Sequence, residues 1–422
     1  MKRRIASPEP EARTPATQQI SERALHVLII PSWYPTTPVD VGGSFFREQA
    51  QALRRAGCKV GVIYPQLRSL RHWRTALSGR YGITLDDDAG IATLRAHTMS
   101  WFPRMPRLMG TQWIRSAVDL YTSYVQKFGK PDLIHAHSLL YAGCAARVLS
   151  ERVHVPYVVT EHSTVYARSL LGAWQHAQAA AAAKAAQRRF AVSPPFCELL
   201  TGYFGCVEMH WTPMPNIVRQ DFLDTSLQEK TQSADFSFLH VSLLDAKKNV
   251  DNLIRAYARV FYGNTNVSLK IGGHGPERPR LQALAQELGV SGQVQFLGAL
   301  SRHQVLSEMQ ACDAFVLPSK YETFGVVVVE ALALGKPVIA TRCGGPESIV
   351  GDDDGVLVPV NDVDSLAQAM RNLRANHDHY KPNAIRASCA ARYSERAVAN
   401  RLITEYRAVC NGYPGSKSHG LG

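Results

Sequence analysis

The sequence predicts an α/β protein with two domains, each built on a parallel sheet covered by helices. Three observations support this fold class. The chain has 422 residues, enough for two domains that each bury a core. Short runs of β-branched residues alternate with helical patterns, which is typical of parallel sheets. The alternation occurs in two series, separated by the proline-rich stretch HWTPMPNIV at His210–Val218.

The first series begins with the apolar run LHVLII, Leu25–Ile30, which we expect to be a buried strand. The sequence GGSFFREQAQALRRAG then carries apolar side chains near helical spacing and predicts a helix over Gly42–Gly57 that ends at its last glycine. The alanine-rich segment Gln178–Gln187 is also helical by propensity. Further strands are expected at Lys59–Pro65, Asp132–His137 and Tyr157–His162.

The second series begins at Phe236. Its expected strands are Phe236–Ser242, Val267–Gly273, Val294–Gly298, Ala314–Pro318 and Pro337–Thr341. Its expected helices are Val250–Phe261, Arg278–Gly289, Arg302–Ala311, a helix ending near Leu334, and Ser394–Val409 with Ser394 as its cap. The two series predict two Rossmann-like domains facing each other across a cleft. Ligands of such sheets bind beyond the carboxyl ends of the strands, so the residues that follow the strands are the candidates for a site.

Composition limits the functional classes. A hydrophobic fraction of 45% and a charged fraction of 19% indicate a soluble globular protein, and no apolar run approaches the roughly 20 residues of a membrane helix. Residues 1–22 start basic but lack the apolar segment of a secretory signal, which favours a disordered tail and a cytoplasmic location. The eight cysteines are scattered singly, which favours reduced thiols over disulfides or a zinc site. The net charge of +12 calls for an anionic partner; a nucleotide or a phospholipid surface is expected, whereas a nucleic acid would rest on charge alone.

The stretch PSKYETFGVVVVEALALGKPVIAT places Glu322 in a polar turn and Glu330 eight residues further on. The run Val326–Val329 could by itself be a strand, but the following EALALGKP favours a helix, because burial overrides weak propensity. In a helix the two glutamates lie roughly 12 Å apart along the axis.

Between these glutamates lie the free amides of the helix start, at Phe324, Gly325 and Val326, where the helix dipole favours an anion. Glycine at position 325 lets a ligand approach the backbone. A nucleotide sugar fits this arrangement, with its diphosphate at the helix start and its sugar and ribose hydroxyls on the two glutamates. The alternative is one surface glutamate and one that caps a helix.

The same stretch, continued as RCGGPESIV, resembles the donor-site signature of the retaining glycosyltransferases of family 4, which have the GT-B fold. The resemblance extends over roughly Leu25 to Val409. It implies that Glu322 contacts the transferred sugar, that the amides of 324–326 contact the sugar and the distal phosphate, and that Glu330 binds the ribose. The stretch PSWYPTTP, which precedes the predicted helix over 42–57, resembles a subgroup common in bacterial surface-polysaccharide synthesis.

Several other motifs agree with this family. VDVGGSFFREQA resembles its glycine loop, which implies that the backbone at Gly42 and Gly43 approaches the diphosphate from the opposite domain; a plain strand-to-helix turn is the alternative. DLIHAHSLLYAG resembles its strand-end histidine motif, so His137 is expected to line the cleft at the sugar. VVTEHS resembles a second strand-end motif, in which Glu161 and His162 are candidates to face the acceptor.

LHVSLLDAKKNVDNLIRAY resembles the phosphate-clamp segment of the family, with Lys248 at the lysine position. An ammonium there would neutralise a phosphate as a point charge. The chain departs from the pattern at the arginine position, which holds Leu243. Candidate substitutes for that arginine are Lys247, Arg342 and His274.

The implied reaction breaks the sugar–phosphate bond with net retention, while Lys248 and the helix amides stabilise the charge that develops on the diphosphate. No metal is expected, because the helix and the lysine replace a cation, and the DDD triplets at 86–88 and 352–354 are interpreted as solvated turns. No cofactor is expected beyond a UDP- or GDP-linked sugar as co-substrate. The alternatives are a catalytically silent GT-B binding partner and another two-domain enzyme, such as a sugar-nucleotide epimerase or a dehydrogenase; the last would need a G-x-G-x-x-G motif after the first strand, which is missing.

The acceptor is expected to bind the first domain. Residues 66–115 hold eight arginines and three acids, interleaved with aromatic residues such as Trp73, Trp101 and Trp113. An anionic membrane face at the inner side of the cell membrane and a lipid-linked glycan acceptor are the partners that this composition suggests. The expected division is a tail over 1–22, an acceptor-side domain over 23–214, a donor domain over 215–390, a returning helix over 391–412 and a tail over 413–422.

Overall fold

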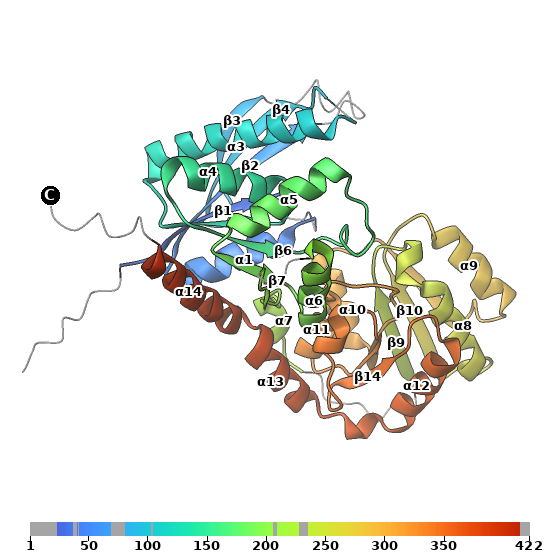
Figure 1. Ribbon diagram of the computed structural model, residues 1–422. Coiled ribbons are helices and arrows are strands. Elements are labelled where there is room, and N and C mark those ends of the chain that lie inside the picture. The colour runs from blue at the N-terminus through green and yellow to red at the C-terminus, as the bar shows by residue number, and fades with distance from the viewer. Residues whose placement is uncertain are drawn as a thin grey trace, which may run out of the picture.

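The computed structural model describes residues 23–36, 40, 42–68, 81–102, 104–205, 209–227 and 235–413. These residues form two α/β units, each with its own sheet, that lie against each other (Figure 1). The tails expected at 1–22 and, apart from Tyr413, at 413–422 lie outside the described residues, as does Trp73.

The N-terminal sheet has eight strands in the order β3-β4-β2-β1-β5-β6-β7-β8. All neighbours are parallel except β3, which runs antiparallel to β4 at the edge. The strands are β1 His26–Pro31, β2 Lys59–Arg68, β3 Gly82–Asp87, β4 Ala92–Met99, β5 Leu133–His137, β6 Tyr157–Glu161, β7 Arg188–Ala191 and β8 Thr212–Pro213. Strands β3, β4, β7 and β8 were not predicted, because their side chains do not form an uninterrupted apolar run.

The C-terminal sheet has six strands in the order β11-β10-β9-β12-β13-β14, all parallel. They are β9 Phe236–Val241, β10 Val267–Gly272, β11 Val294–Gly298, β12 Ala314–Leu317, β13 Val338–Thr341 and β14 Gly355–Val358. In each sheet the chain order reverses beside the first strand, between β1 and β5 and between β9 and β12. A crevice forms at such a reversal, because the connections on its two sides leave in opposite directions. The predicted α/β class with two parallel sheets is confirmed.

Helices cover both faces of each sheet (Figure 1). Those of the N-terminal half are α1 Ser44–Arg55, α3 Pro106–Phe128, η2 Leu139–Gly143, α4 Cys144–Val153, α5 Ala173–Ala185, α6 Pro194–Phe204 and α7 Gln220–Asp224. Those of the C-terminal half are η3 Ala246–Lys248, α8 Val250–Phe261, α9 Arg278–Glu287, α10 Arg302–Ala311, α11 Val326–Ala333, η4 Gly345–Ser348, α12 Val363–Ala375, η5 His377–His379, α13 Pro382–Tyr393 and α14 Glu395–Gly412.

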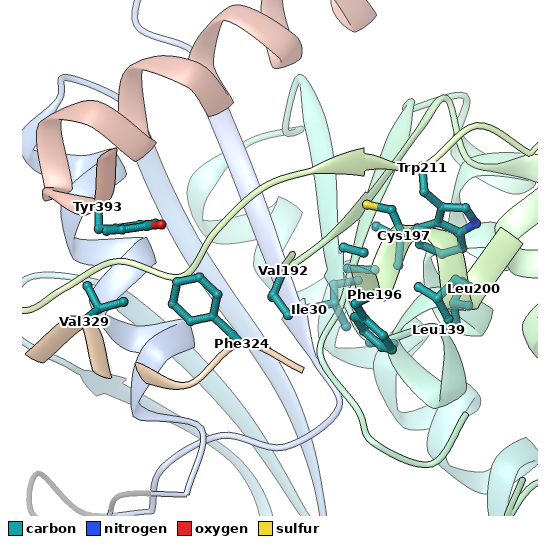
Figure 2. Packing of buried hydrophobic residues seen from close by; sticks show 14 of the residues in the cluster. Ile30, Leu139, Val192, Phe196, Cys197, Leu200, Trp211, Phe324, Val329 and Tyr393 are labelled. Atoms are coloured by element: carbon teal, nitrogen blue, oxygen red, sulfur yellow. The ribbon is translucent and has the colours of Figure 1, made fainter. Parts of the chain in front are cut away.

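One apolar cluster runs continuously from the first half into the second. Figure 2 shows Phe324 beside Tyr393, with Val192 and Phe196 of the N-terminal half on the other side. The rings of Phe324 and Tyr393 meet edge to face, with centroids 5.7 Å apart. Phe324, two residues before α11, is therefore anchored where the two halves meet.

The last helix, α14, returns to the N-terminal half and packs against α1 (Figure 1). Ser394 caps it by accepting a hydrogen bond from the amide of Ala397. Arg55 on α1 donates to Glu395 on α14 at 2.7 Å. The hydroxyl of Tyr406, buried in the core, lies 2.6 Å from Nδ1 of His135 on β5.

Asp352 and Asp353 are exposed in a turn, as expected, but Asp88 and Asp354 are not solvated. Asp88 accepts hydrogen bonds from Tyr34 at 3.0 Å and from Arg47 at 2.7 Å. Asp354 is buried and pairs with Arg392 at 3.0 Å. Each aspartate thus joins segments distant in sequence, a role that local sequence cannot reveal. No helix in the described ranges is long and apolar enough to cross a membrane. The described cysteines are all free thiols.

Candidate active site

The centre of the candidate site is the start of α11, which follows β12. Gly325 is the N-cap and has a φ of 103°, a conformation that favours glycine. The residues 326–330 are helical, so the alternative of a strand over the valine run is excluded. These valines form a helix because three sides of it are buried against β12, β13 and α13, and this burial outweighs their weak propensity.

Glu322 lies in the turn before α11 and is held from both sides. Its amide donates to the carbonyl of Cys343 at 2.9 Å, which fixes the turn against the loop after β13. Its Oε1 accepts from Nζ of Lys248 at 2.6 Å and from Oγ of Ser319 at 2.7 Å. The Lys248 and Glu322 side chains are each 15% exposed, so the pair faces the solvent at one edge only. The carboxylate and the ammonium lie together at the β9–β12 reversal, as their places after these two strands predict.

Lys248 is positioned by the turn between β9 and α8. Asp245 begins η3 and accepts from the amide of Lys247, and its carbonyl accepts from the amide of Lys248. Asn249, with a φ of 57°, then donates from its side chain to the carbonyl of Pro318 at 3.1 Å. The lysine loop and the loop that carries Glu322 are thus tied together by a buried hydrogen bond.

Glu330 lies about one turn inside α11 and is only 2% exposed. Its Oε1 accepts a hydrogen bond from Nη1 of Arg302 at 3.0 Å. Burial raises the pKa of Glu330 to about 7, against the lowering effect of Arg302. A cavity of about 300 Å³ beside Arg302 lies between the two halves and is lined from both, by residues that include Ser44, Glu48 and Arg219. A larger cavity, of about 1060 Å³, opens near Asp235, Lys336 and Lys381 at the opposite end of the C-terminal sheet, away from these glutamates.

His137 ends β5 in the N-terminal half, where it is fully buried beside His162. Its Nδ1 lies 3.1 Å from Nε2 of His162, while its Nε2 is buried without a hydrogen-bond partner among the described residues. Burial, reinforced by His135 and His162, holds the pKa of His137 well below its usual value, so the ring is neutral. Phe46 of α1 packs on the ring at 4.7 Å between centroids. The free nitrogen can make one hydrogen bond to a polar ligand.

The histidine side and the glutamate side touch each other directly. Oγ1 of Thr323, the neighbour of Glu322, donates to the carbonyl of His162 at 3.2 Å. Oγ of Ser193 donates to the carbonyl of Thr323 at 2.7 Å. These contacts bring His137 and His162 close to Glu322, although the sequence separates them by more than 150 residues.

Glu161 does not face an acceptor. It is fully buried, and its carboxylate accepts from the amides of Leu139, His162 and Ser163 and from the hydroxyl of Tyr166. We therefore correct its expected role: Glu161 organises the loops after β5 and β6. The carboxylate can be buried because it accepts hydrogen bonds from loop amides that would otherwise have no partner. His162, 8% exposed, is the one of the two candidates that reaches the site.

The glycine loop before α1 has a tight structure. Gly43 is the N-cap of α1 with a φ of 77°, and a Cβ there would lie 2.9 Å from Cδ1 of Trp33. The amide of Gly42 donates to Asp40 at 2.9 Å, and this hydrogen bond lowers the pKa of the aspartate. A diphosphate that uses the Gly42 amide must therefore replace Asp40 as its acceptor.

The position of the family's clamp arginine remains apolar: Leu243 is 49% exposed after β9. Of the candidate substitutes, Lys247 pairs with Asp245 at 3.5 Å, and Arg342 and His274 are exposed. His274 lies beside the Leu243 segment, because its carbonyl accepts from the amide of Leu244 at 2.8 Å.

Sequence reasoning did not identify two of the residues at the site. Ser319 contacts Glu322, and its place in PSKYE, three residues before the glutamate, is a signal that could have found it. Arg302 contacts Glu330 from the start of α10, and nothing in the local sequence distinguishes it from an ordinary first-turn arginine.

Together, the two sheets and their covering helices define the class: a GT-B fold with two Rossmann-like halves. Two family models cover most of the chain. Residues 42–222 match "Glycosyltransferase Family 4" and residues 224–387 match "Glycosyl transferases group 1". The chain belongs to glycosyltransferase family 4. It is a retaining glycosyltransferase that takes its sugar from a nucleotide sugar.

Relatives and solved structures agree with this assignment. The chain is 27% identical over 405 residues to TuaC from Bacillus subtilis, which is named for teichuronic acid biosynthesis; the match covers 91% of this chain and 99% of TuaC. The structure resembles sucrose-phosphate synthase from Thermosynechococcus elongatus, with a TM-score of 0.72 at 21% identity over 91% of this chain and 98% of the other. It also resembles Anabaena HepE in complex with UDP, with a TM-score of 0.69 at 18% identity over 91% and 100%.

Proposed function

We propose that the protein transfers a sugar from a UDP- or GDP-linked donor to a hydroxyl of a lipid-linked glycan in polysaccharide assembly. The observation that carries the donor site is the pair of glutamates in the turn before α11 and in its middle, with Lys248 hydrogen-bonded to the first at 2.6 Å. The polysaccharide context is supported by the similarity to TuaC over nearly the full length of both chains.

In this proposal the donor lies along the start of α11. The amides of 324–326 and Lys248 bind the diphosphate, because the helix start and the ammonium both favour an anion. Glu322 binds hydroxyls of the transferred sugar, Glu330 binds the ribose diol, and the Gly42–Gly43 backbone approaches the diphosphate from the N-terminal half.

The reacting groups follow from where charge develops. The bond between the sugar and the diphosphate breaks, and negative charge forms on the leaving diphosphate. Lys248 moves from Glu322 toward that charge and stabilises it. The acceptor hydroxyl attacks from the same face as the leaving group and gives its proton to the leaving phosphate. The neutral His137, with Nε2 free, holds the sugar by one hydrogen bond.

The first experiment is a thermal-shift screen of UDP- and GDP-sugars, since a bound ligand raises the Tm by mass action. The sugar that raises the Tm is then tested for transfer to a lipid-linked acceptor. Glu322→Ala should abolish transfer. A silent binding protein would bind the donor with no turnover in wild type, and an epimerase would convert the free nucleotide sugar without an acceptor; either result would refute the proposal.

The N-terminal half also carries an exposed aromatic and basic surface. We call the surface formed by β3, the end of β4 and the start of α3 the α3 face; Figure 1 shows it at the edge of the molecule away from the C-terminal sheet. Its exposed apolar side chains are Tyr81, Ile83, Leu85, Trp101, Phe102, Met105 and Leu108. Trp113, expected to join them, is buried at 4% exposure. Trp101 is 66% exposed and Arg104 and Arg107 lie beside it in the chain, a combination that suits an anionic lipid surface.

Membrane binding is tested by co-sedimentation with vesicles of anionic or neutral lipid. We expect binding to the anionic vesicles that weakens with salt and with the double substitution Arg104→Glu and Arg107→Glu. The matched control Arg255→Glu, an exposed arginine on α8, should bind as wild type. Vesicle binding that changes neither with salt nor with the double substitution would rule out the α3 face as the membrane-binding surface.

A further inference from the structure

A single arginine joins two acidic side chains from different halves of the molecule. Arg302, the first residue of α10, donates from Nη1 to Oε1 of Glu330 at 3.0 Å. From Nη2 it donates to Oε1 of Glu48 at 3.0 Å and to Oγ of Ser44, both on α1. The planar guanidinium holds these partners in a fixed geometry, as an ammonium could not.

The two carboxylates that Arg302 contacts are both largely buried. The side chain of Glu330 is 3% exposed and that of Glu48 is 13% exposed. Burial raises the pKa of both carboxyls, and Arg302 is the largest influence that lowers them. Arg219 also lowers both and Asp221 raises both, but these two residues pair with each other at 3.0 Å. Two buried acids thus depend mainly on one guanidinium.

We propose that Arg302 is a positioning residue for the donor: it keeps Glu330 a carboxylate aimed at the ribose and ties it to the glycine loop of the opposite half. The inference rests on the proposed donor site and adds to it a residue that none of the motifs contains. An ionised carboxylate can accept hydrogen bonds from both ribose hydroxyls, whereas a protonated one must also donate. Ser44 follows Gly43 directly, so the same guanidinium fixes the start of α1, where the loop meets the diphosphate.

The test is the dissociation constant of UDP and of GDP, measured by calorimetry between pH 6 and pH 9. In Arg302→Ala the buried Glu330, still beside Glu48, retains its proton to higher pH. We expect nucleotide binding about tenfold weaker than wild type at pH 7, recovering as the pH rises toward 9. Arg302→Lys keeps the positive charge but cannot donate from two fixed nitrogens to Glu330 and Glu48. It should therefore show an intermediate loss of nucleotide affinity, with a smaller pH dependence.

Glu48→Gln should shift the pH dependence of nucleotide binding in the direction opposite to Arg302→Ala. This opposite shift separates a positioning role from a purely structural one. Removing the second negative charge lets Glu330 ionise at lower pH, because Glu48 raises its pKa. The pH at which nucleotide binding is half lost should therefore move down in Glu48→Gln and up in Arg302→Ala. A merely structural contact would weaken binding in both variants at every pH.

The exposed Arg255→Ala serves as the matched control and should bind as wild type. The inference is overturned if Arg302→Ala and Glu48→Gln both keep the wild-type pH profile while Glu330→Ala loses binding. If Arg302→Ala does not fold, as judged by circular dichroism, the opposite shifts in Arg302→Lys and Glu48→Gln decide alone. If Glu330→Ala binds as tightly as wild type, or if wild type binds neither nucleotide, the proposed donor site itself is wrong.

Discussion

Lys248 and Glu322 hold each other in place through a direct hydrogen bond. Their side chains are 2.6 Å apart and mostly shielded from water. Removal of either charge therefore leaves the other mostly buried without its ionic partner. Lys248→Ala leaves Glu322 with Ser319 as its remaining side-chain partner and removes the cation expected at the leaving diphosphate. We expect kcat to fall by about 10²–10³, while KM for the donor changes less.

This expectation is checked by steady-state kinetics, with Lys247→Ala as the neighbouring control. Lys247 is 43% exposed and pairs only with Asp245 among the described residues, so its loss should leave kcat within a fewfold of wild type. A larger loss in Lys247→Ala than in Lys248→Ala would assign the phosphate contact to Lys247.

Glu330 links donor binding to pH and to stability. Its pKa is raised by burial to about 7, above the value in an unfolded chain, so the folded state binds the proton more tightly. Stability contributed by this group therefore falls as pH rises from about 4.5 to about 7, and at pH 8 the full cost of a buried carboxylate is present.

Glu330→Gln should remove that cost. We expect its Tm at pH 8, without nucleotide, to rise by a few degrees, while the further rise that UDP or GDP gives the wild type disappears. Scanning calorimetry at pH 6 and pH 8 measures both effects, and the gain should be smaller at pH 6. An equal or lower Tm at pH 8 would mean that Arg302 fully offsets the burial of the carboxylate.

At the level of elements, the start of α11 depends on the positive φ angle of its N-cap, Gly325. Gly325 has a φ of 103°, and a Cβ at this position would meet only ordinary contacts, the nearest at 3.6 Å. Gly325→Ala thus introduces backbone strain without a clash, at a cost of about 1–2 kcal/mol. Because the strain is at the helix start, we expect nucleotide binding to weaken as well.

The matched control is Gly263→Ala, which follows α8 with a φ of 74° and open space around it. It should lose similar stability in urea denaturation but bind UDP or GDP as wild type. Equal nucleotide binding by both variants would show that the α11 start tolerates the change.

The elements of the second half from β9 to β13 were predicted closely, whereas β14, α12 and α13 were not predicted, and the first half was predicted less well. Helix α8 and strand β11 have the bounds expected from their sequences, because each combines a clear period with a Gly, Asn or Tyr-Gly stop. Strands β3 and β4 were missed; β4 is held between β2 and β3, and β3 pairs with β4 alone at the sheet edge. The bounds of an element follow from local chemistry, whereas an edge hairpin depends on the partner strand.

At the level of the whole molecule, α14 connects the two halves, because it follows α13 and packs against α1. Tyr406 is fully buried, and its hydroxyl lies 2.6 Å from Nδ1 of His135, whose Nε2 lies 2.7 Å from Oγ1 of Thr160. Tyr406→Phe leaves that histidine nitrogen buried without its partner. We expect a loss of about 1–3 kcal/mol in the free energy of unfolding.

Tyr262→Phe, at a tyrosine that is 70% exposed, is the control and should be neutral. Nucleotide affinity should be unchanged in both, because Tyr406 supports β5 from beneath and does not border the α11 start. Loss of UDP or GDP binding in Tyr406→Phe at a temperature where it is folded would show that this contact also sets the closure of the cleft.

The sequence by itself determined the α/β class, the two series of strands and helices, and the glutamate pair around α11, because these depend on hydrophobic period, on stop signals and on residues close together in the chain. The tertiary structure alone decided that Glu161 is an internal acceptor for loop amides, that Asp88 and Asp354 pair with the distant Arg47 and Arg392, and that Arg302 reaches both Glu330 and Glu48. Each of these depends on segments separated by tens to hundreds of residues, and only the packing of the two sheets brings their polar atoms within hydrogen-bond distance.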